Sequence, residues 1–426
     1  MLCLSCTWLI AKCLFHVIFY MGFEGDGQVL YTHICMKKVL VYHKQLTSLL
    51  GGGTFQPLMF IAELQKSCEV TLALNGDTDI EQVSQMSEVA IDVSRLKVVR
   101  LDPPDGFISR HEWLLSLCRM RKLKALAKEA DVCISTANVM DFGKPGHHFV
   151  YLLSQFGGHS FYDYLMKIQS KTGIRRMLRR LETGFAENVM KPLFGLRPLQ
   201  KILSDTREHI YPTSGYVEEI VRGFYGPFNS TVFYPPTIFE FSDTTVPRDP
   251  LLAIYIGRIF PPKRLTDIIA IVEQARELSG KDIKLQIAGK LAPIPYTDLL
   301  QKMASERPWL SLVGPKYGKE KEIFMLSATY ALHAERDEAF GIAIAEYLKA
   351  GNIPIVPDEG GPREIVDNPE LSFRTNSEAA QKFARLLADD AFHDEQLRRC
   401  AERAAQFSLK AYMERQKSVL DNIVQS

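Results

Sequence analysis

Lys37-Lys38-Val39-Leu40-Val41-Tyr42-His43 has the apolar character and length of a buried strand, and it opens an alternating series of strand-like and helix-like segments. Gly51-Gly52-Gly53 follows, and then Thr54 to Lys66 carries leucine and isoleucine at helical spacing. Glu69 to Leu74 is the next strand-like segment. This order predicts a doubly wound α/β domain with a parallel sheet.

The alternation continues along the chain and then starts again after a polar, proline-containing linker at 242–250. Strands are predicted at 97–101, 132–135 and 149–153, a helix at 113–127, and mainly helical structure at 154–237. A second series has strands at 253–256, 284–288, 309–313, 330–333 and 353–356, and a helix at 263–278. We therefore expect two Rossmann-like domains facing a central cleft, at 36–240 and 241–408, and a helix at 409–426 that crosses back to the first domain.

The composition is that of an ordinary globular protein, with 426 residues of which 46% are hydrophobic. The net charge is +1, from 51 basic and 50 acidic residues, so no overall field favours nucleic acid as a partner. Eight cysteines are scattered without a disulfide framework, which indicates a reducing, cytoplasmic compartment.

Two segments raise the question of a membrane. Residues 1–35 form an apolar extension that Lys12 and His16 interrupt. It can be interpreted as a signal anchor or as a stretch outside the functional protein. Met36-Lys37-Lys38 would be a natural start for the first strand, which favours the second interpretation. Arg175-Arg176-Met177-Leu178-Arg179-Arg180 suits either a solvated helix face or contact with anionic lipid at the cytoplasmic face of a membrane. Both interpretations of each segment stay open.

Glu338 and Glu346 stand eight positions apart around a Phe-Gly turn, in Glu338-Ala339-Phe340-Gly341-Ile342-Ala343-Ile344-Ala345-Glu346. A helix that begins at Gly341 presents unpaired backbone N–H groups and the positive end of its dipole, which suits a phosphate. Carboxylates beside it suit the hydroxyl groups of a ligand. The predicted ligand has a phosphate in the middle and hydroxylated rings at both ends, as a nucleotide sugar does.

Two other segments fit the same ligand. Arg258 and Lys263 flank a loop that Pro261 and Pro262 would stiffen, and two cations there would stabilise the charge that grows on a leaving diphosphate. Gly360-Gly361 precedes a proline that is well suited to the first position of a helix, which predicts another helix start aimed into the cleft.

The E-x7-E segment, Gly257-Arg258 through Lys263, and Gly360-Gly361-Pro362-Arg363-Glu364 together resemble the donor half of group 1 glycosyltransferases, which are retaining enzymes of the GT-B fold. The resemblance runs from about residue 250 to the C-terminus, while residues 37–160 share only the βαβ layout. It implies that Glu338 contacts the donor sugar and Glu346 the ribose. The amides near Phe340, Gly341 and Ile342 would bind the sugar or phosphate.

The resemblance also implies that the reaction needs no metal or other cofactor and that a UDP- or GDP-type nucleotide sugar is the co-substrate. Arg258, Lys263 and Glu338 are the predicted catalytic residues. Asp77-Thr78-Asp79 has the form of a DxD metal motif, but its place after a first-domain strand favours a polar turn.

The loop that holds acceptor or donor in the first domain is less well marked. Gly51, Gly52 and Gly53 suit a loop where backbone approaches a ligand, or else a plain surface loop. Tyr151 stands where the family often has a histidine, and His147 and His148 come earlier. These two histidines are predicted either to reach the acceptor cleft or to be structural.

The predicted function is transfer of a sugar to a glycan or lipid-linked acceptor with retention of configuration. Parts of 130–145 and 225–236 resemble dolichol-linked mannosyltransferases, which favours a mannosyl donor. The alternatives are a nucleotide-sugar epimerase of the same fold and a catalytically silent partner protein.

Overall fold

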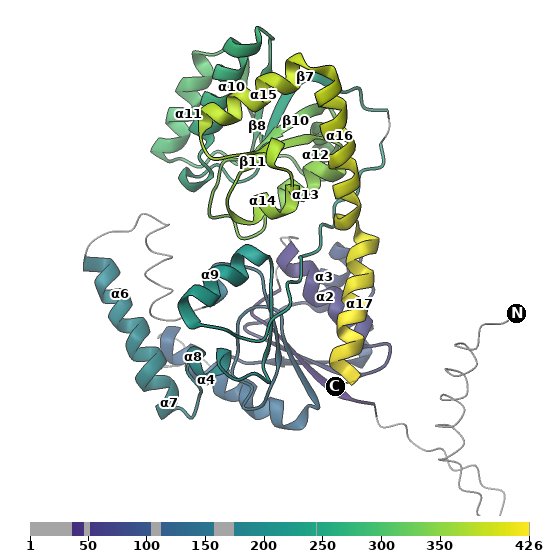
Figure 1. Ribbon diagram of the computed structural model, residues 1–426. Coiled ribbons are helices and arrows are strands. Elements are labelled where there is room, and N and C mark those ends of the chain that lie inside the picture. Colours follow the sequence, from purple (N-terminus) through teal and green to yellow (C-terminus); the bar gives the residue numbers. More distant parts are fainter. Residues whose placement is uncertain (1–35, 47–51, 104–111, 157–173, 244, 426) are drawn as a thin grey trace, which may run out of the picture.

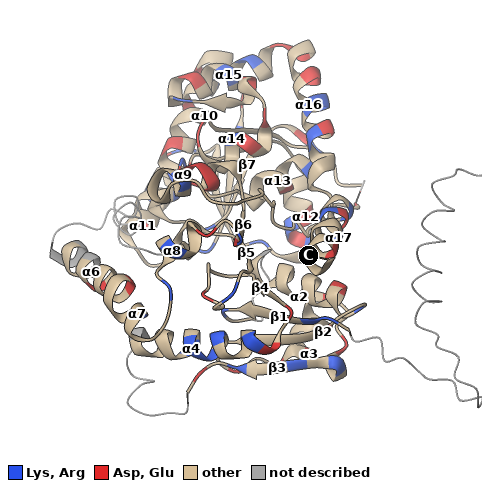
Figure 2. Ribbon diagram, turned by 60° about the horizontal axis from the view of Figure 1, so that its bottom comes forward, with Lys and Arg blue, Asp and Glu red and all other residues tan. Residues whose placement is uncertain are grey.

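The computed structural model describes residues 36–46, 52–103, 112–156, 174–243 and 245–425 (Figure 1). The predicted extension at 1–35 and Gly51 lie outside these residues. Among the described helices, none is both long enough and apolar enough to cross a bilayer. Basic and acidic residues alternate along the ribbons of both halves of the molecule (Figure 2).

The first half of the chain builds a six-stranded parallel sheet in the order β3-β2-β1-β4-β5-β6, the order of a Rossmann sheet. The central strand β1 is buried on both faces after its first residue, as expected for a parallel sheet covered by helices on each side. The strands are β1 (Lys38–His43), β2 (Glu69–Leu74), β3 (Leu96–Arg100), β4 (Val132–Ser135), β5 (His147–Val150) and β6 (His209–Pro212).

The helices of this half are α2 (Gly52–Leu64), α3 (Ile80–Ser87), α4 (Glu112–Leu126), α6 (Ile174–Phe185), α7 (Lys191–Leu193), α8 (Leu199–Leu203) and α9 (Gly215–Tyr225), with a π-helical turn η5 (Ala186–Met190) between α6 and α7. Two sequence predictions are corrected here. The strand predicted at 149–153 begins earlier, at His147, and the segment predicted as helical at 154–237 contains β6. Both strands are only four residues long, which is too short to show a clear period.

The second half builds another six-stranded parallel sheet, in the order β12-β11-β10-β7-β8-β9. Its strands are β7 (Asp249–Ile256), β8 (Lys284–Ala288), β9 (Leu310–Gly314), β10 (Ala328–Leu332), β11 (Ile353–Pro357) and β12 (Ser372–Phe373). Its helices are α10 (Leu265–Ser279), α11 (Pro295–Ser305), α12 (Gly318–Leu326), α13 (Ile342–Lys349), α14 (Gly360–Val366), α15 (Asn376–Ala388) and α16 (Asp390–Ala404).

The last helix, α17 (Leu409–Gln425), returns to the first half of the molecule (Figure 1). Its residues Tyr412, Leu420 and Ile423 are buried in the same apolar core as β1 and α2. The side-chain amide of Gln416 donates a hydrogen bond of 3.0 Å to the carbonyl of Met59 in α2. The end of the chain therefore ties the second half back onto the first.

The carboxyl ends of the two sheets face each other. Ser214, just after β6, donates a hydrogen bond to the carbonyl of Ala339, which follows β10. Glu364 of α14 accepts hydrogen bonds from the backbone amides of Gly215 and Tyr216 at the start of α9. In parallel α/β sheets this edge is where ligands bind.

Candidate functional site

The candidate donor site forms where three strand ends of the second sheet meet. Gly257 and Arg258 follow β7, the segment 333–341 follows β10, and Gly360 begins α14 just after β11. The predicted residues Arg258, Lys263, Glu338 and Gly360 therefore come from loops at one edge of one sheet. This is the edge that faces the first half of the molecule.

Lys263 is at the centre of this site. It ends a 3₁₀ turn, η6 (Pro261–Lys263), that the two prolines begin. Its ammonium group forms ion pairs with the carboxylates of both Glu335 and Glu338. Nε2 of the buried His333 lies 3.9 Å from a carboxylate oxygen of Glu338. The cation that was predicted to meet a leaving diphosphate is thus held by two acids.

Charge and burial act on this cluster in opposite directions. Burial favours the neutral form of Glu338, but the charge of Lys263 outweighs it and lowers the pKa of Glu338. Burial and the neighbouring Glu338 raise the pKa of Glu335. Burial lowers the pKa of His333 to about 4, so its imidazole is neutral at pH 7. Glu338 is therefore the anion of the group, and Glu335 is the carboxyl that takes up a proton more easily.

His333, Glu335 and Glu338 each place a potential metal-ligand atom within 4.8 Å of the others. The Lys263 ammonium, however, already pairs with both carboxylates. The negative charge that would attract a divalent cation is largely compensated by this lysine. Sequence reasoning missed His333 and Glu335, although they stand only five and three positions before Glu338.

The E-x7-E segment spans the start of α13. Gly341 is the N-cap residue, and no side chain caps the helix, so its first N–H groups are open to a ligand. Gly341 has φ +105°, and a Cβ atom there would lie 2.8 Å from Cδ1 of Ile344. Phe340 is buried and packs on Tyr234, while Ile342 is the first helical residue.

Glu346, on the next turns of α13, is buried. Its carboxylate is paired at 2.6 Å with the ammonium of Lys321 in α12. Sequence reasoning missed Lys321, because nothing within its own segment, 318–326, marks it. A buried carboxylate with one cationic partner is held in a fixed position, as an acceptor of ligand hydroxyl groups must be.

Gly360 and Gly361 serve close packing. A Cβ at Gly360 would lie 2.5 Å from the carbonyl oxygen of Arg336, and one at Gly361 would lie 2.5 Å from Cα and the carbonyl oxygen of Phe340. The amide of Gly361 also donates a 2.9 Å hydrogen bond to the carbonyl of Glu338. The start of α14 therefore supports the loop that carries Glu338.

Arg258 has an exposed side chain, and its guanidinium has no hydrogen bond or ion pair with any residue that the structure describes. Its carbonyl accepts a 3.2 Å hydrogen bond from the Tyr255 hydroxyl. At the neighbouring Gly289 a Cβ would lie 2.2 Å from the carbonyl of Gly257, so the backbones of the two loops touch. The arginine is thus a free cation on a tightly packed loop.

The prediction of a glycine loop at 51–53 is only partly met. Gly52 and Gly53 are the first residues of α2, so they belong to a helix start and not to a loop. No atom lies within 4 Å of a Cβ built at Gly53. The helix therefore begins at Gly52, two residues before the predicted start at Thr54.

The prediction that His147 or His148 reaches the acceptor cleft is wrong, because both begin β5, at the sheet edge opposite the cleft. His148 is buried, accepts a hydrogen bond from the amide of Met140, and lies 3.0 Å from Glu208. Glu208 in turn pairs with Arg197. Burial lowers the pKa of His147 to about 4. Both histidines are structural.

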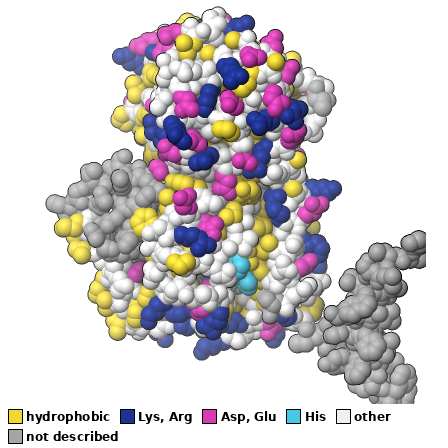
Figure 3. All heavy atoms as spheres, in the orientation of Figure 1, with side chains coloured by type: hydrophobic (Ala, Val, Ile, Leu, Met, Phe, Trp, Pro, Cys, Tyr) yellow, Lys and Arg dark blue, Asp and Glu magenta, His cyan; other side chains and the backbone are white. Residues whose placement is uncertain are grey.

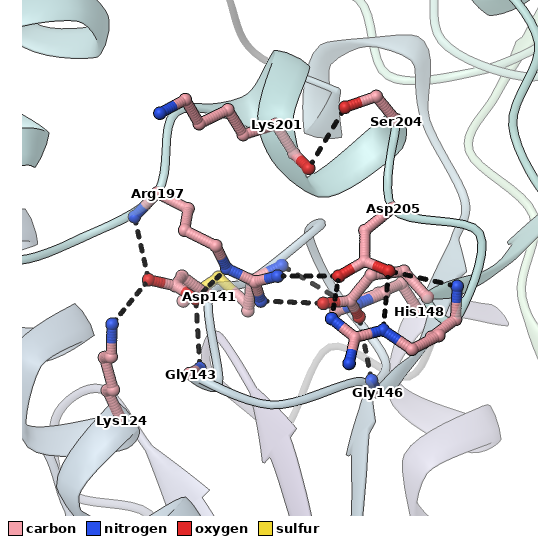
Figure 4. Close-up of polar contacts among 12 residues, drawn as sticks. Lys124, Asp141, Gly143, Gly146, His148, Arg197, Lys201, Ser204 and Asp205 are labelled. Atoms are coloured by element: carbon pink, nitrogen blue, oxygen red, sulfur yellow. Dashed lines mark hydrogen bonds and ion pairs between the residues drawn. The ribbon is translucent and has the colours of Figure 1, made fainter.

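The same network holds the helices of the first domain. Arg197 also pairs with the buried Asp141, at 2.7 Å, and Asp141 pairs with Lys124 of α4 (Figure 4). Of the DxD segment, Asp79 caps α3 and Asp77 pairs with Arg100. The interpretation of this segment as a polar turn agrees with these contacts.

The comparisons with known proteins can now be set beside this geometry. Residues 237–407 match the family model for glycosyl transferases group 1. Sucrose-phosphate synthase from Thermosynechococcus elongatus has a TM-score of 0.62 at 14% identity, over 91% of this chain and 99% of that one. HepE from Anabaena in complex with UDP and glucose has a TM-score of 0.60 at 13% identity, over 91% and 100%.

A third solved structure, of WaaG, a glycosyltransferase involved in lipopolysaccharide biosynthesis, has a TM-score of 0.58 at 13% identity, over 89% of this chain and 99% of that one. No curated protein matches the chain. Two parallel six-stranded sheets whose carboxyl edges face each other form the GT-B fold that these structures share. The family match assigns residues 237–407 to the glycosyl transferases group 1 domain.

Proposed function

We propose that this enzyme transfers a sugar from a UDP- or GDP-type nucleotide sugar to a glycan or lipid-linked acceptor, with retention of configuration and without a metal ion. The observation that carries the proposal is the arrangement at α13. An uncapped helix start at Gly341 lies between the two anchored carboxylates of Glu338 and Glu346. A nucleotide sugar has the matching layout, with phosphate in the middle and hydroxylated rings at both ends.

In this proposal Lys263 and the unpaired Arg258 hold the diphosphate. Negative charge grows on the leaving diphosphate as the glycosyl bond breaks, so cations there stabilise the transition state more than the ground state. Lys263 exchanges part of its contact with Glu335 and Glu338 for contact with phosphate. Glu338 then accepts hydrogen bonds from the sugar, and Glu346 accepts them from the ribose.

The acceptor side belongs to the first domain, 36–240, and the donor side to 241–408. Retention follows from the family resemblance, with a leaving-phosphate oxygen helping to remove the acceptor proton. A mannosyl group is the sugar that the similarity at 130–145 and 225–236 favours. HepE, which shares the fold, was crystallised with UDP and glucose, so a UDP donor is the competing choice.

The test is incubation of the protein with UDP- and GDP-linked glucose, galactose, N-acetylglucosamine and mannose, in buffer with EDTA, together with glycan and lipid-linked acceptors. The proposal expects one donor to give a product whose anomeric configuration, read by NMR coupling constants, matches that of the donor. An inverted product would contradict retention. Activity that EDTA abolishes and Mg²⁺ restores would contradict metal independence, and sugar isomerised without an acceptor would indicate an epimerase.

A further inference from the structure

A polar pocket of about 250 Å³ opens at the carboxyl edge of the first sheet. Its walls come from the ends of β1 and β2, the segment after β4, α4, and the segment around η5 and α7. This is the edge that contacts the donor domain through Ser214 and Ala339. The lining includes Lys44, Asn75, Arg119, Asn138, Ser154 and Lys191.

Two polar atoms of this pocket, Oδ1 of Asn75 and Nζ of Lys44, have no partner among the described residues. The side chain of Asn75 is only 9% exposed, and its carbonyl oxygen Oδ1 is buried without a hydrogen bond. Buried polar atoms are rarely left unsatisfied, so this oxygen points to a donor group from a ligand. The ammonium of Lys44 has no ion pair with any described residue, whereas Lys191 is neutralised by Glu187 at 2.6 Å. The pocket therefore offers an acceptor for a hydroxyl group and a cation for an anion.

An apolar groove of about 670 Å³ continues from this pocket and shares Glu187 and Leu199 with it. It runs between α6–η5 on one side and α8–α9 on the other. Its walls include Leu181, Phe185, Val189 and Phe224, of which Leu181 is 60% and Phe185 is 55% exposed. Hydrophobic side chains are visible on this flank of the first domain (Figure 3). A continuous apolar surface of this kind normally marks a binding site.

Helix α6 adds a second feature that suits an amphiphile. It carries Arg175, Arg176, Arg179 and Arg180 on the same short helix as the exposed Met177, Leu178 and Leu181. A basic amphipathic helix binds at the boundary between anionic head groups and acyl chains. Leu181 and Phe185 of this helix line the groove.

We infer that the acceptor is a membrane amphiphile whose hydroxylated, anionic head group occupies the polar pocket while its apolar chain lies in the groove along α6. This inference rests on the proposed function. In the transfer, the acceptor hydroxyl oxygen forms a bond to the anomeric carbon, and the bond from that carbon to the diphosphate oxygen breaks. The diphosphate leaves with the bonding electron pair, and the hydroxyl proton passes to its oxygen.

The test uses dodecyl phosphate below its critical micelle concentration, titrated calorimetrically into the full chain. Inorganic phosphate and dodecanol are titrated separately as the head and the chain alone. The inference expects dodecyl phosphate to bind at one site at least tenfold more tightly than either part. Lys44→Gln and Phe185→Ser should each weaken this binding about tenfold. Lys410→Gln and Leu278→Ser, exposed residues of the same types outside the pocket and groove, should leave it unchanged.

UDP and GDP titrations on the same samples separate this inference from the proposed function. If a nucleotide binds and dodecyl phosphate does not, the inference about the acceptor is overturned, while the proposed donor site is supported. Binding that only Phe185→Ser weakens indicates a membrane contact without a head-group pocket and also overturns it. A dimer in sedimentation that Phe185→Ser dissociates would show that a second copy of the chain occupies the groove, with the same consequence.

Discussion

Replacement of Gly361 by alanine is expected to lower stability and donor affinity together. The Cβ atom would lie 2.5 Å from Cα and the carbonyl oxygen of Phe340, and ordinary contact begins near 3.4 Å. Both neighbours are backbone atoms that cannot rotate away, so α14 and the loop at 338–340 must separate by about 0.9 Å, the difference between these distances. Overpacking of this kind costs about 1 to 3 kcal/mol.

The same displacement moves Glu338, whose carbonyl is bonded to the Gly361 amide. A shift of about 1 Å in a positioned group can lower a rate by about 100-fold. The assays are denaturant unfolding and calorimetric titration with UDP and GDP. Gly53→Ala is the matched control, because open space surrounds that position in the first turn of α2. There alanine should be neutral or stabilise by about 0.4 to 1 kcal/mol. A Gly361→Ala protein with unchanged stability and nucleotide affinity would refute the packing role.

Three other changes test the contacts of carboxylates around the site. Burial and Glu338 raise the pKa of Glu335 to about 7, above the ordinary value of a glutamate. Between the ordinary and the raised pKa the unfolded chain releases a proton that the folded chain keeps, so stability falls as pH rises. Glu335→Gln should flatten this slope in unfolding curves at pH 5 and 8, and parallel curves would count against it. Lys321→Met leaves the Glu346 carboxylate buried and unpaired. This should lower the free energy of unfolding in urea by about 1 to 3 kcal/mol, and adding Glu346→Gln should recover most of that loss. No recovery would show that Lys321 stabilises the protein through other contacts. Glu364→Ala removes the hydrogen-bond acceptor for two amides at the start of α9 and should lower stability by about 1 kcal/mol. An unchanged melting temperature would mean that this contact between the two halves does not stabilise the protein.

The sequence was sufficient for the architecture wherever strands were long and buried on both faces. β2 and β8 have the predicted bounds, and α17 begins at the predicted Leu409. The strand β6 was not predicted, because four residues within a mainly helical stretch are too few to show the period of a strand. His147 and His148 were misplaced for a related reason. They stand just before the strand predicted at 149–153, whereas pairing with β4 and β6 makes them the first two residues of β5.

In the site, sequence reasoning could find groups that a local motif carries, such as Glu338, Gly341 and Glu346. It could not find partners that only the folded sheet supplies. Lys321 reaches Glu346 from another helix, and Glu364 reaches α9 across the domain contact. The packing role of Gly361 could not be predicted either, because the sequence does not distinguish a glycine next to a bound phosphate from a glycine next to a backbone carbonyl.

The central claim is a nucleotide-sugar site at the start of α13, and calorimetric binding of UDP and GDP tests it most directly. The titrations use the protein from Met36, its Glu346→Gln variant, and Glu277→Gln as a control at an exposed helical glutamate. The account predicts that one nucleotide binds at one site, that Glu346→Gln weakens it about tenfold or more, and that Glu277→Gln does not. Folded protein that binds neither nucleotide, or binds one equally well in all three proteins, would contradict it.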